Sequence, residues 1–595
     1  MRTSIQSLTC QLPALSRAIG FASVPMPRHV LAIIGLAMAV APTRAADLPA
    51  LLPMPVSVTL TGGQFTITSA TKVLHTKGDA RLADAAAYLA QRLSQAFDHN
   101  VVAEATDASK EQTGAILMTT AGADPALGAE GYELAVTAQG AVIRAPQAAG
   151  AFYGGITLLQ LVPAAAFRGQ ALVEDKLGGT LTKPAPRPCD EPNISRKPKP
   201  VDALVVPCAT IADQPRFAWR GLLIDMARHF WTINELKAYV DYLAIHKLNS
   251  LQLHLTDHQN WCVEIMKYPS LTPEKALNAA DPQRLANQTY DSLARHYYTQ
   301  EELRDLVAYA AKRFVNIVPE IEMPGHCTAL MRAGLNIECT LDGKPALGRG
   351  ELCPGNDNTF VVLQNILDEV LAVFPGKYIH MGGDECGTGT WEKCSGCRKR
   401  MENESLKNTT ELHGYFVGRM SDYIQNKGRT LVGWDEILES GAKTGAIGMY
   451  WRSGQADKLV ASAAQNGQHL VMTPTAHCYF DYVQSPDKQS EPEGFGGNAI
   501  TLKTAYELNP IPAEVAKVDP KLSLGVQANL WGERMQSFPH VLYMTYPRAC
   551  ALAEVAWSPD GPRDYAGFFK RVQTQCKRLD AAGINYRQPT ATDQP

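Results

Sequence analysis

Eight short apolar segments, each followed by a helical pattern or a long loop, recur between residues 220 and 530. Their composition and spacing predict parallel strands joined by helices. The segments are 221–224, 250–255, 315–319, 378–381, 430–433, 446–450, 469–472 and 524–527. Eight such units fit a TIM (β/α)8 barrel with insertions. A doubly wound sheet is disfavoured, because polar residues follow nearly every strand instead of gathering at one switch point.

Helix boundaries within this region are marked by local signals. Thr232 with Glu235, and Thr299 with Glu302, form the capping-box pattern that opens a helix. A longer helix is predicted at 408–427, where Gly428 ends it. These signals place a helix between neighbouring strands, as the barrel requires.

The 595 residues exceed one compact domain. Short β-type runs and two helical segments precede the barrel and predict a small, non-catalytic α+β domain. The predicted organisation is an α+β domain at 46–165, a Pro-rich loop or linker at 166–210, the barrel at 211–560, and a C-terminal helix and tail at 561–595.

The N-terminus has the pattern of an export signal. A short apolar run at 30–41 follows Arg28 and precedes the small residues Ala45 and Ala46. The run is too short to span a bilayer and suits the core of a signal peptide, with a buried helix as the alternative. We predict a signal peptide at 1–45, with Met26 as a second candidate start, and a periplasmic or secreted protein that does not stay in the membrane after processing.

The net charge bears on which partners the chain could bind, and the cysteines bear on whether it forms disulfides or binds a metal. The net charge of −3 favours neither nucleic acid nor an anionic membrane as partner. Of the 13 cysteines, Cys10 would be lost with the signal peptide. An exported chain with the remaining twelve is a candidate for disulfides, and we predict one between Cys339 and Cys353. Cys394 and Cys397 form a lone CxxC, which is a weak zinc signal; a local disulfide or two free thiols are preferred.

Polar and aromatic side chains follow the predicted strands, and in a barrel they would meet at one mouth. Two glycines and two adjacent acids, Asp384 and Glu385, follow the fourth strand. Paired carboxylates at a strand end are typical of glycoside hydrolysis. The other strand-end residues are Asp225, Arg228, His229, His254, Asp257, His258, Trp261, Glu320, Glu322, His326, Trp434, Asp435, Glu436, Trp451, Tyr479, Asp481, Trp531 and Glu533.

Three indoles among several carboxylates suit a sugar, whose ring has apolar faces and hydroxyl edges. Each residue also has a plainer structural interpretation: a tryptophan in the core, His254 as a bonded interior residue, or Glu320 and Glu322 paired with arginine. A zinc site from His254, Asp257, His258 and His326 is disfavoured, because no HxH or HExxH spacing occurs. We expect no metal and no cofactor.

Several long motifs in order resemble glycoside hydrolase family 20, the β-N-acetylhexosaminidases. They include 217–230, 253–258 with Trp261, 318–326, 380–385, 432–436, 479–481 and 530–533, and the resemblance covers about 50–165 and 213–560. His258 is a departure, since the family often has a second aspartate there. The resemblance implies a barrel enzyme preceded by the family's non-catalytic α+β domain.

The resemblance also implies residue roles. Glu385 would be the general acid/base, Asp384 would hold the acetamido N–H, and Tyr479 would bind the acetamido carbonyl. His326 and Asp257 would stand behind Glu385. The sugar would be held by Arg228, Asp481 and Glu533 at its hydroxyls and by Trp434, Trp451 and Trp531 around its ring and acetyl group.

Physical reasoning from the acid pair favours the family's substrate-assisted mechanism. Successive residues of an extended segment point to opposite sides, so Asp384 and Glu385 are poorly placed to flank one anomeric carbon. Retaining enzymes with two carboxylates hold them about 5 Å apart across the bond. Attack by the substrate's own acetamido oxygen, giving an oxazolinium intermediate, removes that need.

The predicted function is therefore an exo-acting retaining glycosidase that removes terminal β-linked N-acetylglucosamine or N-acetylgalactosamine. Its partner would be an N-acetylhexosamine-terminated oligosaccharide or glycoconjugate. Two alternatives stay open at this point, namely a catalytically inactive sugar-binding barrel and a metal-dependent hydrolase on the same barrel. The sequence leaves the oligomeric state and the natural glycan open.

Overall fold

The computed structural model of the chain describes residues 48–168, 199–272, 297–439, 445–454, 457–487, 491–495, 497–535 and 537–595. The predicted signal peptide at 1–45 and most of the predicted Pro-rich linker lie outside these residues, so export stays a prediction. Pro49–Pro595 form one compact unit. Among the residues described, no helix has both the length and the apolar character needed to cross a membrane.

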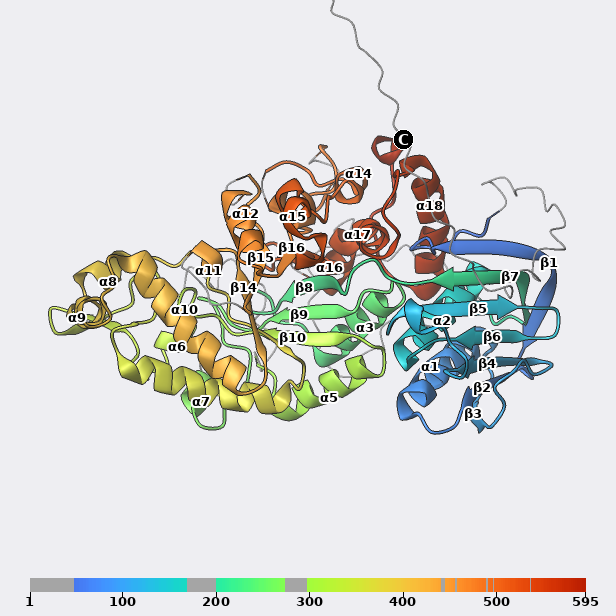
Figure 1. The fold of residues 1–595 in the computed structure, drawn as a ribbon, viewed down its shortest axis with the longest axis horizontal. Helices are drawn as coiled ribbons and strands as arrows, with labels where there is room; N and C mark the ends of the chain where they lie inside the picture. The colour runs from blue at the N-terminus through green and yellow to red at the C-terminus, as the bar shows by residue number, and fades with distance from the viewer. Residues whose placement is uncertain are drawn as a thin grey trace, which may run out of the picture. The chain divides into compact units, whose positions relative to one another are not determined.

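All eight predicted barrel strands form, and they close into a parallel barrel in the order β10-β13-β14-β15-β16-β17-β8-β9. Figure 1 shows β8, β9 and β10 running side by side. The predicted TIM barrel, preceded by an α+β domain, is confirmed. The strands are β8 (Trp219–Asp225), β9 (Ser250–His254), β10 (Asn316–Glu320), β13 (Tyr378–His380), β14 (Thr430–Trp434), β15 (Ile447–Tyr450), β16 (Leu470–Met472) and β17 (Ser523–Leu530).

Helices connect these strands, and the predicted caps are present. Thr232 and Glu235 form a capping box at the start of α3 (Ile233–Ala244), and Thr299 and Glu302 do the same for α5 (Gln300–Ala311). The other helices of this region are α6 (Thr328–Met331), α7 (Asp357–Val373), α8 (Gly389–Lys393), α9 (Ser395–Asn403), α10 (Thr409–Asn426), α11 (Glu436–Glu439), α12 (Asp457–Gln465), α13 (Thr475–Cys478), α14 (Leu502–Tyr506), α15 (Ala513–Val518), α16 (Phe538–Thr545), α17 (Arg548–Trp557) and α18 (Tyr565–Ala582).

The register of the barrel aligns the ends of its strands. Asp225 of β8 pairs with His254 of β9, and His254 pairs with Glu320 of β10. Glu320 in turn pairs with His380 of β13. The barrel interior is filled mainly by apolar side chains, namely Trp219, Leu223, Val318, Val432, Trp434, Ile447, Met449 and Val471. Two buried amides lie among them, since Gln527 donates a hydrogen bond to Gln252 at 2.7 Å. The row of polar residues is therefore the level at which the packed core ends and the barrel mouth begins.

The small domain is a seven-stranded mixed sheet in the order β1-β7-β5-β6-β4-β2-β3, with two helices packed against it. Its strands and helices carry the low-numbered labels in Figure 1. They are β1 (Ser57–Thr68), β2 (Lys72–Thr76), α1 (Ala80–Phe97), β3 (Ala103–Thr106), β4 (Ala115–Thr119), β5 (Tyr132–Val136), β6 (Ala141–Arg144), α2 (Ala148–Leu161) and β7 (Ala203–Asp213).

The boundary predicted for this domain is corrected by β7. Most of β7 falls in the predicted linker 166–210, yet the strand lies inside the sheet, between β1 and β5. Pro207 disguised it, because proline lacks the N–H that a central strand donates. The proline is tolerated because it pairs with Gln64 beside a register shift in β1.

Buried ion pairs join the small domain to the base of the barrel. The Arg220 guanidinium contacts both carboxylate oxygens of Glu130 at 2.8 Å, and Lys247 Nζ lies 2.8 Å from Asp213. Arg220 is fully buried. Breaking such a pair leaves an uncompensated buried charge, so these contacts fix how the two domains join.

Candidate active site

Glu320 organises the floor of the barrel mouth. Its carboxylate accepts hydrogen bonds from Gln252 (2.8 Å) and the Trp434 indole (2.9 Å), and it contacts the rings of His254 (2.7 Å) and His380 (3.0 Å). Burial would raise the pKa of Glu320, but His380 and His254 hold it well below its ordinary value. Glu320 is thus a paired interior carboxylate, but the partner expected in the plainer interpretation was wrong, since histidines and not arginine pair with it.

Arg228 gathers carboxylates from three strand ends. Its guanidinium lies 2.9 Å from Asp225, 2.7 Å from Asp257 and 3.8 Å from Glu533. Burial would raise the pKa of Asp257, but Arg228, His254 and His326 lower it well below the ordinary value. Asp257 is therefore an anion whose charge is already matched by a cation.

The acid pair follows β13 on a backbone that only special residues adopt. Gly382 and Gly383 have φ of 68° and 91°, and a Cβ at Gly382 would lie 1.7 Å from the Glu322 carboxylate. Glu385 itself is left-handed, with φ of 45°. A left-handed non-glycine residue is strained, and such strain concentrates at functional sites.

This backbone corrects one premise of the sequence argument. The segment that carries Asp384 and Glu385 is not extended, so the two side chains do not alternate across a strand. Both carboxylates instead lie 3.6 Å from the same nitrogen, Nε2 of His326. The pair thus sits on one side of the mouth, side by side.

His326 links the acid pair to the Arg228 cluster. Its Nδ1 lies 3.1 Å from Asp257, and its φ of 54° is also left-handed. Burial lowers the pKa of His326, but Asp384, Asp257 and Glu385 raise it to about 12. The ring is therefore a cation. Hydrogen bonding to His326 in turn lowers the pKa of Glu385.

Aromatic rings wall the space beside the acids. The rings of Trp434 and Trp531 are 5.6 Å apart, and Tyr479 stacks with Trp451 at 6.2 Å. The Trp434 indole is fixed by Glu320, and the Trp451 indole donates to Glu436 at 3.0 Å. The rings are thereby held in place before any ligand arrives.

A pocket of about 220 Å³ opens between the acids and the rings. Every residue predicted to be catalytic or substrate-binding lines it. The lining consists of Arg228, His254, Asp257, Glu322, His326, Asp384, Glu385, Trp434, Trp451, Thr475, Tyr479, Asp481, Tyr482, Phe495, Trp531 and Glu533. Thr475, Tyr482 and Phe495 were missed, because Thr475 begins the short helix α13 and the other two lie on the loop beyond it, so none directly follows a strand.

Other strand-end candidates support the pocket from behind. Asp435 accepts the backbone N–H of Trp451 at 3.0 Å and pairs with Arg452. Trp261 is buried and donates its indole N–H to the Val263 carbonyl, so its plainer interpretation as a core residue holds. Asp435 thus positions the wall residue Trp451, and neither Asp435 nor Trp261 lines the pocket.

Four buried polar atoms of the pocket have neither a hydrogen-bond partner nor an ion-pair partner in another described residue, whereas His326 Nδ1 has only its ion pair with Asp257. The four atoms are Arg228 Nε, Glu322 Oε2, Asp384 Oδ1 and Asp481 Oδ1. Burying a polar group unpaired costs about 1–3 kcal/mol, so such groups normally meet a ligand or water. Their convergence on one pocket points to a ligand rich in hydroxyl and amide groups.

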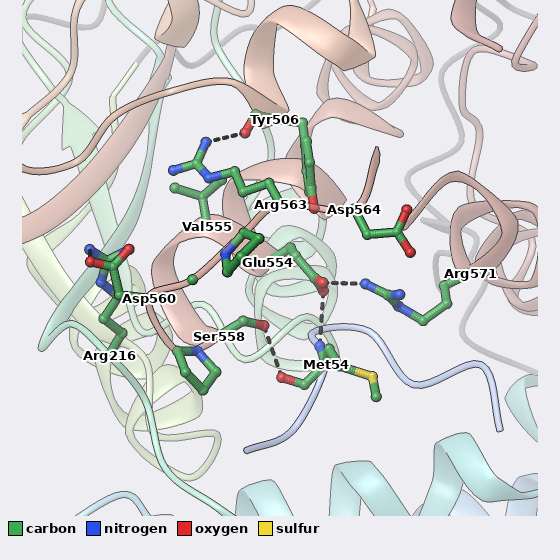
Figure 2. A pocket seen from close by; sticks show the side chains of 13 residues that line it. Met54, Arg216, Tyr506, Glu554, Val555, Ser558, Asp560, Arg563, Asp564 and Arg571 are labelled. Atoms are coloured by element: carbon green, nitrogen blue, oxygen red, sulfur yellow. Dashed lines mark hydrogen bonds and ion pairs between the residues drawn. The ribbon is translucent and has the colours of Figure 1, made fainter. Parts of the chain in front are cut away.

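A second cavity, of about 240 Å³, lies between the N-terminal segment and the C-terminal helices (Figure 2). Its carboxylates are engaged: Glu554 accepts the Met54 N–H and pairs with Arg571, and Asp560 pairs with Arg216, while Arg571 Nε has no hydrogen-bond partner among the described residues. This cavity joins structural elements and offers no unpaired catalytic group among the residues described.

Two sets of possible metal ligands share the pocket, Asp257 with His258 and His326, and His254 with Asp257 and Glu322. Both depend on Asp257, which already pairs with Arg228. A metal cation there would compete with the Arg228 guanidinium for Asp257, and in the first set it would have to displace a proton from His326. The charges of the site therefore disfavour a metal.

Comparisons with known proteins agree with this geometry. Residues 217–560 match the glycosyl hydrolase family 20 catalytic-domain model, and residues 48–214 match the model for domain 2 of that family. A β-hexosaminidase of Porphyromonas gingivalis is 34% identical over 91% of this chain, which spans 64% of that relative's length. A β-hexosaminidase of Akkermansia muciniphila is 32% identical, and the match covers 75% of this chain and 83% of the Akkermansia protein.

A solved structure has the same architecture. A mutant Streptomyces plicatus β-hexosaminidase in complex with its product GlcNAc superposes with a TM-score of 0.72 and 29% identity. The match covers 93% of this chain and 99% of that one. Sequence motifs, family models and fold agree, and this chain belongs to glycosyl hydrolase family 20.

Proposed function

We propose that the chain is an exo-acting β-N-acetylhexosaminidase that uses the acetamido group of its substrate as the nucleophile. The observation that carries this proposal is the placement of Asp384 and Glu385 side by side at an aromatic pocket. The volume of about 220 Å³ lies below the ~300–1,000 Å³ of sites for drug-sized ligands, and so suits one terminal sugar.

In the first step, the acetamido carbonyl oxygen attacks the anomeric carbon while the Glu385 carboxylic acid protonates the departing glycosidic oxygen. The products are an oxazolinium ion and a free alcohol. In the second step, the Glu385 carboxylate takes a proton from water as the water oxygen attacks the anomeric carbon. The bond between that carbon and the acetamido oxygen breaks, which restores the acetamido group and releases the N-acetylhexosamine. Two displacements at that carbon retain its configuration.

Glu385 needs a proton for the first step, yet His326 lowers its pKa in the ligand-free pocket. The Glu385 side chain is 58% exposed there, so water also stabilises its charged form. A bound sugar would displace that water, and desolvation favours the neutral acid. Substrate binding thus prepares Glu385 for its role.

Asp384 and Tyr479 would hold the two ends of the acetamido group. The unpaired Oδ1 of Asp384 is free to accept the acetamido N–H, and the charge of the carboxylate opposes the positive charge that forms on the ring. Burial raises the pKa of Tyr479 well above its ordinary value. The phenol therefore keeps its proton, and its O–H can donate a hydrogen bond to the acetamido oxygen.

The remaining lining suits a sugar ring. Arg228, Asp481 and Glu533 would bind hydroxyl groups, and Trp434, Trp451 and Trp531 would pack on the ring and the acetyl methyl. Arg228 Nε and Asp481 Oδ1 lack a partner in another described residue, which leaves them available to hydroxyls.

A panel of three aryl glycosides tests this function. We expect turnover of the β-N-acetylglucosaminide and the β-N-acetylgalactosaminide, and negligible turnover of the plain β-glucoside, which lacks the nucleophile. Comparable hydrolysis of the plain glucoside would contradict the proposed chemistry. Binding of N-acetylglucosamine without turnover of any glycoside would favour the inactive sugar-binding barrel instead.

A further inference from the structure

Four cysteines that are far apart in the sequence meet in one buried cluster, made of Cys339, Cys353, Cys394 and Cys397. All four are buried, and their sulfurs lie within 4.8 Å of one another. Cys339 begins β11 (Cys339–Leu341), which pairs with β12 (Lys344–Ala346), and Cys353 follows that hairpin. Cys394 and Cys397 lie at the start of α9.

The predicted disulfide between Cys339 and Cys353 is wrong, because every described cysteine is a free thiol. The sulfurs do not separate into pairs. Cys397 lies 3.6 Å from Cys339 and 3.5 Å from Cys353, while Cys353 also lies 3.8 Å from Cys394. A disulfide requires one exclusive partner for each sulfur, and this arrangement offers none.

The spacing of the sulfurs matches a tetrahedral site. Zinc bonds thiolate sulfur at about 2.3 Å, so the edges of a regular ZnS₄ tetrahedron are roughly 3.8 Å long. Three of the six sulfur–sulfur separations are 3.5, 3.6 and 3.8 Å, close to that edge, and all six are within 4.8 Å. An iron–sulfur cluster would hold its cysteines around a larger inorganic core, so the spacing favours a single ion.

The surroundings of the cluster close it to solvent and hold its loops together. The backbone N–H of Gly355 hydrogen-bonds to the Cys353 sulfur. A Cβ at Gly355 would lie 2.2 Å from the Gly396 carbonyl carbon, so the two loops pack backbone against backbone. Trp391 and Leu412 complete a small apolar core.

We propose that Cys339, Cys353, Cys394 and Cys397 bind one structural Zn²⁺ ion. Four thiolates fill the coordination sphere and leave no open position for a substrate, which distinguishes a structural site from a catalytic one. Binding displaces the thiol protons and keeps the sulfurs from pairing as disulfides. This proposal departs from the sequence-based expectations of no metal in the chain and of a local disulfide or free thiols at Cys394 and Cys397.

The ion would join two loops that border Glu385. The first runs from Cys339 to Cys353 and carries Arg349, whose positive charge helps to lower the pKa of Glu385. The second runs from Glu385 to Cys394, and the Arg349 side chain packs over its Gly387. Insofar as Glu385 has the proposed catalytic role, loss of the ion should also lower kcat. Metal content tests the site independently of that role.

The test is the metal content of the full-length chain, purified without chelators and measured by inductively coupled plasma mass spectrometry. We expect one zinc per chain. Cys353→Ser and Cys397→Ser should each lose it, since removing a ligand should cost more than the ~10–100-fold in affinity that supporting residues contribute. The matched control is Cys208→Ser, which changes a buried cysteine of the small domain and should keep one zinc.

If the cysteine variants fail to fold, a second measurement on the unmodified protein still tests the proposal. In the unmodified protein, the four thiols should resist alkylation until a strong chelator removes the metal, and Zn²⁺ should restore both protection and thermal stability. Disulfides among the four, four reactive thiols without metal, or iron in place of zinc would each overturn the proposal.

Discussion

Replacing Glu385 with glutamine should lower kcat by about 10²–10⁴-fold on glycosides with a poor leaving group, because glutamine cannot donate the proton. The loss should shrink for aryl glycosides whose leaving group departs without protonation. KM should change little, since the amide keeps the size of the side chain. Steady-state kinetics with leaving groups of graded pKa measures both effects.

The matched control for this substitution is Glu133→Gln, which makes the same chemical change on an exposed position of β5. It should leave both kinetic constants unchanged. Near-normal turnover of a poor leaving group by the Glu385→Gln variant would remove Glu385 from the role of general acid.

Asp384→Asn should lower kcat by roughly 10²–10³-fold. This is the loss typical of removing one preorganised group that stabilises the charge of a transition state. The carboxylate charge matters most as the oxazolinium ion forms, so kcat should fall by more than KM rises. Asparagine would also present to the acetamido N–H either its own NH₂ group, which cannot accept a hydrogen bond, or a neutral oxygen, which carries no charge to offset that of the ring. Kinetic constants on the aryl β-N-acetylglucosaminide give the split between kcat and KM.

Asp342→Asn is the control for this variant. Asp342 is an exposed residue of the turn before β12, with φ of 49°, a conformation that asparagine tolerates. Its kinetics should match those of the unmodified protein. A rise in KM with an unchanged kcat in Asp384→Asn would show that Asp384 binds the ground state and the transition state equally, against the proposed role.

The barrel could be predicted because its signals are local. Each strand is a short apolar run, and capping boxes such as Thr232 with Glu235 mark helix starts within four residues. Once eight strands alternate with helices, the fold requires their carboxyl ends to converge. Asp384, Glu385 and Trp434 were therefore placed at one mouth without any knowledge of distances.

The failures share a different cause, since they depend on contacts between distant segments. Pro207 hid β7, because only pairing with β1 reveals that the missing N–H falls beside a register shift. The close approach of Gly382 to Glu322 and the left-handed backbone of Glu385 are two further features that no local pattern records. Phe495 reaches the pocket from a long loop whose path the sequence leaves open.

The cysteine cluster shows the same limit. Cys394 and Cys397 form a visible pair, but their partners Cys339 and Cys353 have no recognisable spacing. Export and the short interval between them suggested a disulfide. Only the packing of α9 against the β11–β12 hairpin brings the four sulfurs to one point.

The nucleophile is tested most directly by varying the acetamido group of the substrate. Aryl β-glycosides with acetamido, monofluoroacetamido, difluoroacetamido and trifluoroacetamido groups differ mainly in the basicity of the attacking oxygen. If that oxygen is the nucleophile, kcat/KM should fall steeply and steadily with each added fluorine. A rate that does not depend on fluorination, together with a covalent sugar trapped on a protein carboxylate, would contradict the substrate-assisted mechanism.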